Sequence, residues 1–496
     1  MSKGSPRASG PLSRPVLAVV VALLVGVCTS GGVAAVDPAE AATARYFASI
    51  RDQPSLLLAF LSDMPKGGDL HNHLTGAIYA ESYLRWAAED NLCLATATMT
   101  IVAATCDTAA GQPPVTAVLG NPALFNQAID AMSMRHWNRA LNGHDHFFGA
   151  FDKFGPPSDR TGDMLAEVAV RAAAERASYL ELMLTPNGAG ARQKGRAAGW
   201  EPDLGRLRDR LIADGFHDVV AEARRRMDVA EARQRNLLRC GASDADAGCR
   251  VTVRYISQAG RARVPEQVFA ELLAGFEIAV QDARFVGVNL VQPEDDPTAV
   301  RDFSLQMKMI DFLHGKYPGV RIALHAGELV EGLVPPESLR FHIRESVRTG
   351  HACRIGHGGG VMYEDDPLAL LREMASRRVL VEIALSSNDL ILGIRGKRHP
   401  LAMYLKYGVP VVLVTDDAGV ARSSLTLEFR KAVEEQAVDY RTLKRMVNNS
   451  LEFAFADEAM KTRLKSELAA AFREFERRAR TVNPGARNRD PGTASP

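Results

Sequence analysis

Short apolar runs alternate with longer amphipathic stretches along the chain from Pro65 onward. Apolar runs of about four to eight residues, bounded by glycine, proline or polar residues, are typical of buried strands. Eight such runs are present: Gly68–Leu74, Ser178–Leu184, Val251–Ser257, Phe285–Val291, Arg321–His325, Arg354–Gly356, Leu380–Leu385 and Pro410–Thr415.

Amphipathic stretches separate most of these runs and predict helices, the clearest being Val300–Tyr317, Pro336–Arg348, Asp366–Arg377 and Pro400–Tyr407. Apolar strands interleaved with helices indicate a parallel sheet, and eight strands are the number that closes a (β/α)8 barrel. The main alternative is an open, doubly wound sheet. No glycine-rich phosphate loop follows an early strand, so the pattern favours an α/β fold of the TIM-barrel type.

Two long segments interrupt the rhythm, Asn91–Arg160 and Asn187–Gly248. Both follow early strands, so we expect these largely helical insertions near the carboxyl ends of the barrel strands. After the last strand, Leu425–Arg480 predicts several extra helices. The Pro/Gly/Arg-rich tail Thr481–Pro496 predicts disorder. The expected organisation is a single domain over residues 36–480.

The amino terminus has the layout of a secretory signal. Basic residues precede a short apolar run, Val16–Val27, and small residues follow it through Ala35. The run is too short for a comfortable membrane span. We therefore expect residues 1–35 to be cleaved and the protein to be exported, periplasmic or secreted.

Cleavage after Val33-Ala34-Ala35 fits this layout, and Ala39-Glu40-Ala41 is a second candidate. Lipid attachment at Cys28 is the weaker alternative, because Val27 is bulkier than the residue that usually precedes a lipidated cysteine.

The net charge limits the kinds of binding partner, and the cysteine spacing indicates the cellular compartment. With 60 basic and 59 acidic residues the net charge is +1, which argues against nucleic acid or an anionic membrane as a partner. Cys93 and Cys106 form one close pair and Cys240 and Cys249 another. Each pair predicts a short disulfide loop in an oxidising compartment. Cys353 has no nearby partner and is expected to be a core thiol.

Polar residues that can bind a metal lie at the predicted strand ends. Side chains alternate along a strand, so His71 and His73 point the same way and can grip one ion. Further candidates are His325, His357, Asp416 and Asp417. Active sites of (β/α)8 barrels lie at the carboxyl ends of the strands, so these residues predict one metal-containing site.

The order of these motifs resembles the adenosine deaminases. The matching segments are Met64-Pro-Lys-Gly-Gly-Asp-Leu-His-Asn-His-Leu-Thr-Gly-Ala77, His325-Ala-Gly-Glu328, Arg354-Ile-Gly-His-Gly358, Ser386-Ser-Asn388 and Thr415-Asp-Asp417. The export signal and the cysteine-bearing insertions make the chain similar to the secreted, growth-factor-related branch. The resemblance covers roughly residues 65–430.

This resemblance implies a hydrolase that acts on the C–N bond of a cyclic amidine. It would convert adenosine or 2'-deoxyadenosine into inosine or 2'-deoxyinosine plus ammonia. One zinc ion per chain would be held by four side chains, His71, His73, His325 and Asp416.

The resemblance also implies catalytic and substrate-binding roles. Glu328 would protonate purine N1, which requires a carboxyl pKa raised by burial. His357 would orient the attacking water and accept its proton. Asp417 would bond purine N7.

Three positions depart from the family pattern and bear on substrate recognition. Thr75 stands where many adenosine deaminases carry an Asp that contacts the ribose 5'-hydroxyl. Gln292 replaces a glycine whose backbone N–H meets purine N3, and Asn289 replaces an Asp. We predict that all three residues bind the substrate, and that the purine edge and the ribose are recognised differently from the family pattern.

Other functions stay open. One is deamination of a different 6-aminopurine, such as a 5'-modified nucleoside. Another is a binuclear barrel metallohydrolase, but Phe285–Val291 lacks the lysine that bridges two metals in such enzymes. A third is a secreted binding or signalling protein with a vestigial site. The sequence does not determine the oligomeric state, and a homodimer is one of the states left open.

Overall fold

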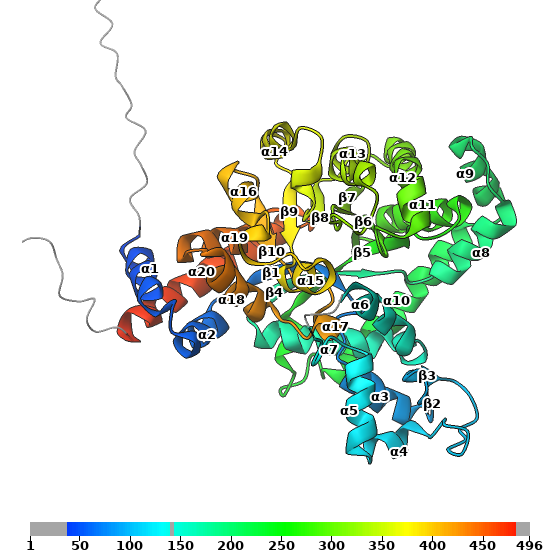
Figure 1. The fold of residues 1–496 in the computed structure, drawn as a ribbon, viewed down its shortest axis with the longest axis horizontal. Coiled ribbons are helices and arrows are strands. Elements are labelled where there is room, and N and C mark those ends of the chain that lie inside the picture. Colours follow the sequence, from blue (N-terminus) through cyan, green and yellow to red (C-terminus); the bar gives the residue numbers. More distant parts are fainter. Residues whose placement is uncertain (1–36, 139–142, 483–496) are drawn as a thin grey trace, which may run out of the picture.

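Eight parallel strands form a barrel at the centre of the molecule (Figure 1). A computed structural model of the protein describes residues 37–138 and 143–482. The barrel strands, in spatial as well as chain order, are β1 (Gly67–His73), β4 (Ala177–Leu184), β5 (Thr252–Gly260), β6 (Phe285–Val291), β7 (Arg321–Ala326), β8 (Arg354–His357), β9 (Leu380–Ile383) and β10 (Val411–Leu413). The predicted fold class is confirmed.

Backbone hydrogen bonds just beyond β10 close the barrel. Asp416 N donates to His71 O at 2.9 Å, and His73 N donates to Asp416 O at 3.0 Å. These bonds join the end of the last strand to the end of the first. The closure therefore brings residues 71–73 and Asp416 to the same point.

Helices surround the barrel and bury its apolar strands on their outer side. The helices that connect the strands are α3 (Ala80–Glu89), α7 (Thr161–Ala174), α10 (His217–Leu237), α11 (Pro265–Gln281), α12 (Pro297–Lys316), α13 (His342–Arg348), α14 (Pro367–Ser376), α15 (Leu385–Leu392) and α16 (Leu401–Lys406), and α17 (Ala418–Ala421) follows the last strand. Strand side chains such as Leu182, Val288 and Ile355 are at most 1% exposed. Among the described residues, no helix is both long and apolar enough to cross a membrane.

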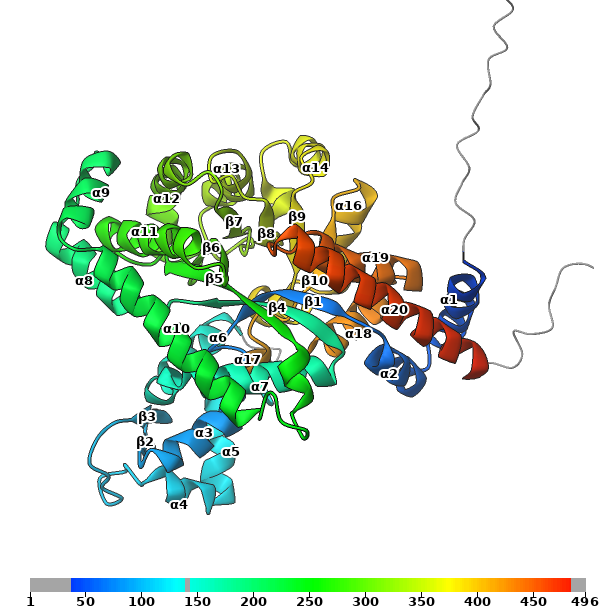
Figure 2. The same cartoon turned by 180° about the vertical axis from the view of Figure 1, so that it is seen from behind.

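Helices from both chain ends pack together on one side of the barrel (Figure 2). They are α1 (Pro38–Ile50), α2 (Pro54–Asp63), α18 (Leu425–Gln436), α19 (Tyr440–Glu452) and α20 (Glu458–Val482). Phe60 lies at their centre, with its ring centroid 5.2 Å from that of Phe47 and 5.0 Å from that of Phe475. The sequence predicted the carboxyl-terminal helices but not α1 and α2, which are part of the same packed unit.

The first insertion carries a small two-stranded sheet and short helices. Its elements are β2 (Cys93–Ala95), β3 (Thr100–Val102), α4 (Val115–Leu119), α5 (Pro122–Ala131) and α6 (His144–Ala150). A Cys93–Cys106 disulfide, with the two Cα atoms 5.4 Å apart, ties this sheet to the loop that follows it. The end of the insertion, α6 and the residues that follow it, reaches the carboxyl ends of the barrel strands, where it lines a cavity.

The second insertion holds α8 (Gly188–Ala198) and α9 (Leu204–Ala213) before α10 returns along the barrel. Cys240 and Cys249 form the second predicted disulfide, with a Cα separation of 5.6 Å. This bond lies just before β5 begins, so it is at the amino end of the strands. The expectation that the whole insertion lies at the carboxyl ends is therefore wrong for this part.

Three further expectations have plain outcomes. Cys353 is a free thiol, as expected, but it is half-buried rather than in the core. Helix α20 ends at Val482, two residues inside the predicted disordered tail. The predicted export signal, its first cleavage site and Cys28 lie outside the described residues, while Ala39–Ala41 lies in the first turn of α1.

Candidate functional site

Four side chains converge at the closure point of the barrel. His71 and His73 come from β1, His325 from β7, and Asp416 from the segment that follows β10. Their nearest ligand atoms, one from each residue, all lie within 4.8 Å of one another. The structure therefore brings together the four predicted metal ligands.

The ring nitrogens of this cluster fit a metal ion. His73 Nε2 lies 3.1 Å from His325 Nε2, and His71 Nε2 lies 3.2 Å from Asp416 Oδ1. His71 Nε2 is buried and makes no hydrogen bond among the described residues. Imidazole nitrogens and a carboxylate oxygen that face one another in this way form a donor set suited to zinc.

Each histidine of the cluster is held from behind through its other nitrogen. His71 Nδ1 lies 2.8 Å from Glu382 Oε2, His73 Nδ1 lies 2.9 Å from Gln258 Oε1, and His325 Nδ1 lies 3.0 Å from Asn289 Oδ1. Acceptors at Nδ1 place the proton there and leave the Nε2 lone pair for a metal, the usual arrangement around metal-ligating histidines.

Asp416 is fixed in the same way. Ser387 Oγ donates to Asp416 Oδ2 at 2.6 Å, which leaves Oδ1 toward the histidines. The backbone of Asp416 has a φ of 59°, in the left-handed region that side chains other than glycine rarely adopt. Strained backbone that persists at a strand end is typical of functional sites.

The pKa values of the histidines fit neutral ligands at two of the three positions. Burial lowers the pKa of His73 to about 4 and lowers that of His325 well below its usual range. Burial would also lower the pKa of His71, but the Asp416 and Glu382 carboxylates raise it to about 10. A cation among these groups would take the place of that proton.

Glu328 lies in a buried position beside the cluster. Its carboxylate Oε1 is 3.6 Å from His357 Nδ1, and its backbone N–H donates to Glu294 Oε2 at 2.7 Å. Burial and the nearby charge of Asp416 raise the pKa of Glu328 well above its usual value. The raised pKa favours the protonated form of this glutamate, which can act as an acid.

His357 lies between Glu328 and the metal ligands. Its Nε2 is 4.0 Å from Asp416 Oδ2, and its Nδ1 is 3.2 Å from the Asn388 amide nitrogen. Burial lowers the pKa of His357 to about 4, so the ring is neutral and can accept a proton. Its φ of 66° is a second left-handed backbone at a strand end.

Asp417 fits closely beneath the loop after β1. A Cβ atom at Gly76 would lie only 1.6 Å from Asp417 Oδ1, so glycine is required for this approach. That oxygen is buried without a hydrogen-bond partner among the described residues, and burial together with Asp416 raises the carboxyl pKa well above its usual value. The Asp417 carboxyl group can therefore form a hydrogen bond with a ligand placed above it.

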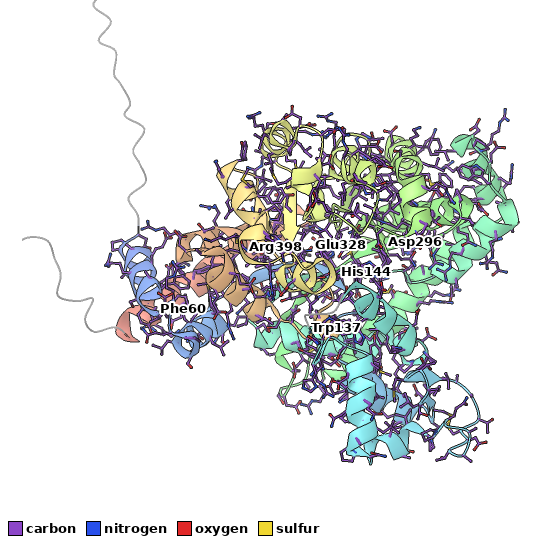
Figure 3. All side chains as sticks on the ribbon, in the orientation of Figure 1. Phe60, Trp137, His144, Asp296, Glu328 and Arg398 are labelled. Carbon is purple, nitrogen blue, oxygen red and sulfur yellow. A yellow bond between two sulfur atoms is a disulfide. The ribbon has the colours of Figure 1, made fainter. Side chains whose placement is uncertain are left out.

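All of these site residues except His71 line one cavity of about 540 Å³ at the carboxyl ends of the strands; they are His73, His325, Glu328, His357, Asp416 and Asp417. Its wall includes the aromatic residues Phe147 and Phe148 of α6 and Phe151 just after it. His144, also in α6, lines the same cavity as Glu328 (both are labelled in Figure 3) and contacts Asp295 Oδ1 through Nε2 at 2.9 Å. The cavity thus combines acid, base and metal-ligand chemistry with an apolar wall that suits a flat ring.

The three departures from the family pattern lie in different places. Thr75 lines the cavity. Gln292 also lines it, with a φ of 82° and with its side-chain Oε1 accepting from Ala262 N at 3.2 Å. Asn289 is buried behind His325, so its observed contact supports orientation of that ring.

Sequence reasoning missed several residues that hold the site. Glu382, Gln258 and Ser387 each contact a predicted metal ligand, and Glu294 holds the backbone of Glu328. Glu382 had a usable signal, because a lone carboxylate in an apolar strand is buried only when it is paired. Ser387 lies inside the matching segment Ser386–Asn388, to which no role was given, and Gln258 had no signal.

Comparison with known proteins agrees with this geometry. The family model described as adenosine deaminase matches residues 158–471. An adenosine deaminase from Clostridium perfringens is 27% identical over 191 residues, which are 38% of this chain and 54% of the relative. The chain thus spans about half the length of the curated relatives that it matches.

Solved structures with the same fold include two of 19% and 17% identity. The N6-methyl-AMP deaminase from Arabidopsis thaliana has a TM-score of 0.53 and covers 84% of this chain and 99% of its own. A zinc-bound amidohydrolase from Burkholderia ambifaria has a TM-score of 0.53 and covers 86% of this chain and 94% of its own. At these identities they show the fold alone.

The family match begins at residue 158 and so leaves out β1 with His71 and His73, which the barrel nevertheless places beside His325 and Asp416. The match extends over more than half of the sequence. This chain belongs to the adenosine deaminase family.

Proposed function

We propose that this protein is an exported, zinc-dependent adenosine deaminase that hydrolyses adenosine and 2'-deoxyadenosine to their inosine forms and ammonia. The observation that carries the proposal is the convergence of His71, His73, His325 and Asp416 next to Glu328 and His357, at a cavity that all of them except His71 line. A binding protein would not require this combination of an acid, a base and metal ligands.

The chain's own residues would perform the proton transfers. Zinc, when bound, would supply the Lewis acid that activates water at neutral pH. His357 would orient that water and accept a proton from it. Glu328 would give its proton to purine N1, which makes C6 electrophilic. A C6–O bond would form as His357 takes the proton of the water, and the C6–N bond would break as His357 passes that proton to the amino group, which leaves as ammonia. The proton of the new C6 hydroxyl would return to Glu328, while N1 keeps the proton that Glu328 gave.

Asp417 and the aromatic wall would orient the purine. In its protonated form, the Asp417 carboxyl can donate to purine N7, which is an acceptor. The rings of Phe147 and Phe148 would cover the base and exclude bulk water, which strengthens each electrostatic contact inside.

Export is supported by the two disulfides. Disulfide bonds persist in oxidising compartments and are rare in reducing ones. Cys93–Cys106 and Cys240–Cys249 therefore agree with the predicted signal at residues 1–35.

A second candidate is deamination of another 6-aminopurine nucleoside. Gln292 favours it, because this side chain lines the cavity where the family pattern has a glycine. Replacing Gln292 with glycine should raise kcat/KM for adenosine if the side chain crowds the ring edge.

The decisive experiment is ultraviolet absorbance with adenosine, with and without a chelator, on three proteins. The natural protein should deaminate adenosine and lose activity with chelator. His325→Ala should lose bound metal and activity together. Glu328→Gln should keep metal, measured by elemental analysis, and lose at least about 100-fold in kcat. Full activity of Glu328→Gln would show that N1 protonation has another source.

A further inference from the structure

A second, larger cavity adjoins the catalytic cavity. It lies between α10 and the start of α7, has a volume of about 1020 Å³, and shares Thr75 and Gln258 with the catalytic cavity. We call it the side groove. Thr75 follows His73 by two residues, and Gln258 contacts His73 directly, so the groove begins beside the metal ligands.

The two cavities together exceed the size of a nucleoside site. Ligand pockets for small molecules span about 300–1000 Å³, and the catalytic cavity alone reaches about 540 Å³. If the proposed function holds, Glu328 and His357 contact the C6 edge of the purine. The sugar then lies away from that edge, and substituents on it can extend into the side groove.

The charges of the two cavities differ in sign. Among the described residues, the lining of the catalytic cavity includes no Lys or Arg and five carboxyl groups: Asp145, Asp152, Glu328, Asp416 and Asp417. The lining of the side groove includes four arginines and three carboxylates: Arg160, Arg225, Arg226, Arg233, Asp159, Asp163 and Glu222. A negatively charged substituent would therefore be favoured in the groove.

Two of these arginines, Arg225 and Arg226, are incompletely neutralised, whereas the other two have carboxylate partners of their own. Arg160 is held by Asp90 and Glu89 from outside the groove, and Arg233 pairs with Asp163 at 3.0 Å. Arg225 and Arg226 share a single carboxylate, Glu222, which accepts from Arg226 Nε at 2.7 Å. Two guanidinium groups against one carboxylate leave an excess positive charge, and guanidinium suits phosphate and carboxylate alike.

The position of Arg226 connects this charge to the catalytic cavity. Its Nη1 lies 3.4 Å from the carbonyl oxygen of Pro186, two residues beyond the end of β4. The preceding residue, Thr185, donates its hydroxyl to Gln258 O at 2.8 Å. Arg226 thus contacts the segment after β4 that also bonds to Gln258, the residue that holds His73.

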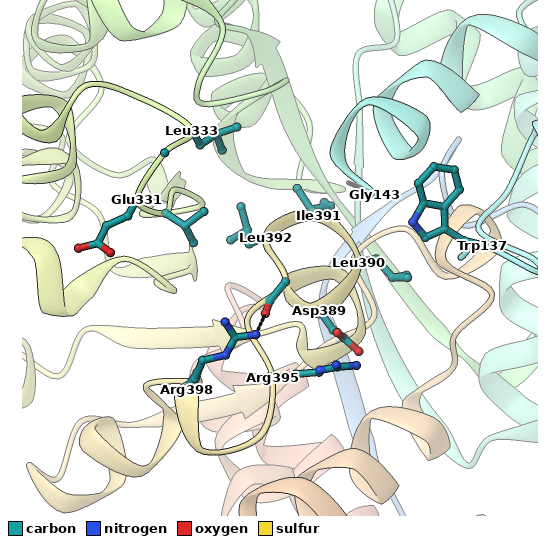
Figure 4. Close-up of a pocket in the computed structure, with 13 residues that line it drawn as sticks. Trp137, Gly143, Glu331, Leu333, Asp389, Leu390, Ile391, Leu392, Arg395 and Arg398 are labelled. Atoms are coloured by element: carbon teal, nitrogen blue, oxygen red, sulfur yellow. Dashed lines mark hydrogen bonds between the residues drawn. The ribbon is translucent and has the colours of Figure 1, made fainter. Parts of the chain in front are cut away.

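Another cavity beside the catalytic one lacks this excess. It has a volume of about 440 Å³ and shares Ile391 with the catalytic cavity. Figure 4 shows Arg395 and Arg398 in its wall together with Glu331 and Asp389, so among the described residues of the lining the charges of both signs are equal in number. Arg398 also donates to the carbonyl oxygen of Gly393.

We infer that the side groove binds an anionic substituent on the sugar of the substrate, phosphate or carboxylate, through Arg225 and Arg226. The inference rests on the proposed deamination and names its substrate class. The enzyme prefers 6-aminopurine nucleosides that carry such a group over adenosine itself.

The test compares kcat/KM for adenosine, AMP and S-adenosylhomocysteine. In the natural protein kcat/KM should exceed that of adenosine by ten-fold or more for at least one of the two compounds that carry an anionic group, AMP with its phosphate or S-adenosylhomocysteine with its carboxylate, and the preferred compound identifies the group. The Arg225→Gln/Arg226→Gln double variant should lose this preference with adenosine turnover unchanged. Glu222→Gln should strengthen the preference, because it removes the competing carboxylate.

Two matched variants control for loss of charge alone. Arg224→Gln removes the neighbouring positive charge of α10, which lies 3.8 Å from Asp282 and outside the groove lining, and should keep the preference. Arg395→Gln tests the other cavity. Equal kcat/KM for all three substrates, or a preference lost in Arg395→Gln and kept in the double variant, would overturn the inference.

Binding of inosine 5'-monophosphate and inosine separates this inference from the proposed function. Calorimetry should give tighter binding of the phosphorylated compound by ten-fold or more, and the double variant should abolish the difference. If no 6-aminopurine is deaminated, the proposed function fails, and this binding comparison still decides the groove. Equal binding of the two compounds would overturn the groove even in an active deaminase.

Discussion

Glu382 is the residue on which the position of His71 depends. Its Oε2 lies 2.8 Å from His71 Nδ1, while its Oε1 lies 2.7 Å from Arg354 Nε. Partners of this kind typically contribute about 10–100-fold to metal affinity. We expect Glu382→Gln to weaken zinc binding by that factor, measured by competition with a chelator of known affinity.

Arg348→Gln is a suitable control for that measurement, because Arg348 pairs with Glu373 on the outer surface of the barrel. Zinc affinity of Glu382→Gln equal to that of the control would show that the ring of His71 is held by its packing alone.

Gly76 gives a second prediction at the level of one atom. The Cβ of Gly76→Ala would overlap Asp417 Oδ1, so the carboxyl group must move. We expect a loss of about 100-fold or more in kcat/KM with metal content unchanged, since a misplacement of about 1 Å costs this much.

Gly315→Ala is the matched control, because nothing lies within 4 Å of the Cβ that it adds on α12. It should leave activity unchanged and favour the helix slightly. Equal activity of the two alanine variants would mean that Asp417 has no fixed role in turnover.

The predicted ligands were accessible to sequence reasoning because each ends a recognisable strand. His71, His325 and Asp416 are separated by more than 300 residues in total, yet barrel topology alone places their strand ends together. The residues behind them were less accessible. Gln258 contacts His73 only because β5 runs three residues farther than the apolar pattern indicated.

At the scale of elements, α6 is held over the catalytic cavity by His144. Burial would lower the pKa of this ring, but Asp295 and Asp145 raise it. The charged pair therefore stabilises the docked helix below the unfolded pKa of about 6.5 and loses that contribution as pH rises through the higher folded value.

We accordingly expect amide hydrogens of α6 to lose protection as pH increases from 6 to 9. In the Asp295→Asn variant, the amide hydrogens of α6 should have low protection factors already at pH 6. Hydrogen exchange measured by mass spectrometry tests both expectations. Protection that does not change with pH in either protein would assign the docking to the phenylalanine contacts alone.

The first disulfide should stabilise the inserted sheet. Cys93 and Cys106 are 13 residues apart, and closing a loop of this size contributes about 3 kcal/mol. Cys93→Ser/Cys106→Ser should lower the free energy of unfolding by that amount in urea titrations. An unchanged midpoint would show that the insertion unfolds independently of the barrel.

Element boundaries were predictable where pairing partners enforce them. β6 coincides with the predicted run Phe285–Val291, since it is buried between two neighbours. β9 ends at Ile383 because α15 begins at Leu385, and an apolar run cannot show where a strand becomes a helix. Helices α1 and α2 were missed although each begins with proline, a common first helical residue.

For the whole molecule, metal binding should stabilise the barrel. Its ligands come from β1, from β7 and from the segment after β10, so they connect the first and last strands. At a zinc concentration 1000 times the Kd, linkage contributes about 4 kcal/mol. Chelator should lower the melting temperature of the natural protein by several degrees.

His325→Ala supplies the control, because a protein that binds no zinc should melt at one temperature with or without chelator. The same shift in both proteins would mean that the chelator acts elsewhere in the molecule.

The closure of the barrel at Asp416 also sets an order of events during synthesis. The two histidines of β1 leave the ribosome long before Asp416 does, and the backbone bonds between them cannot form until then. A growing chain therefore holds an incomplete ligand set until most of its length exists. We therefore expect chains truncated before Asp416 to bind metal weakly, because they lack one of the four ligands.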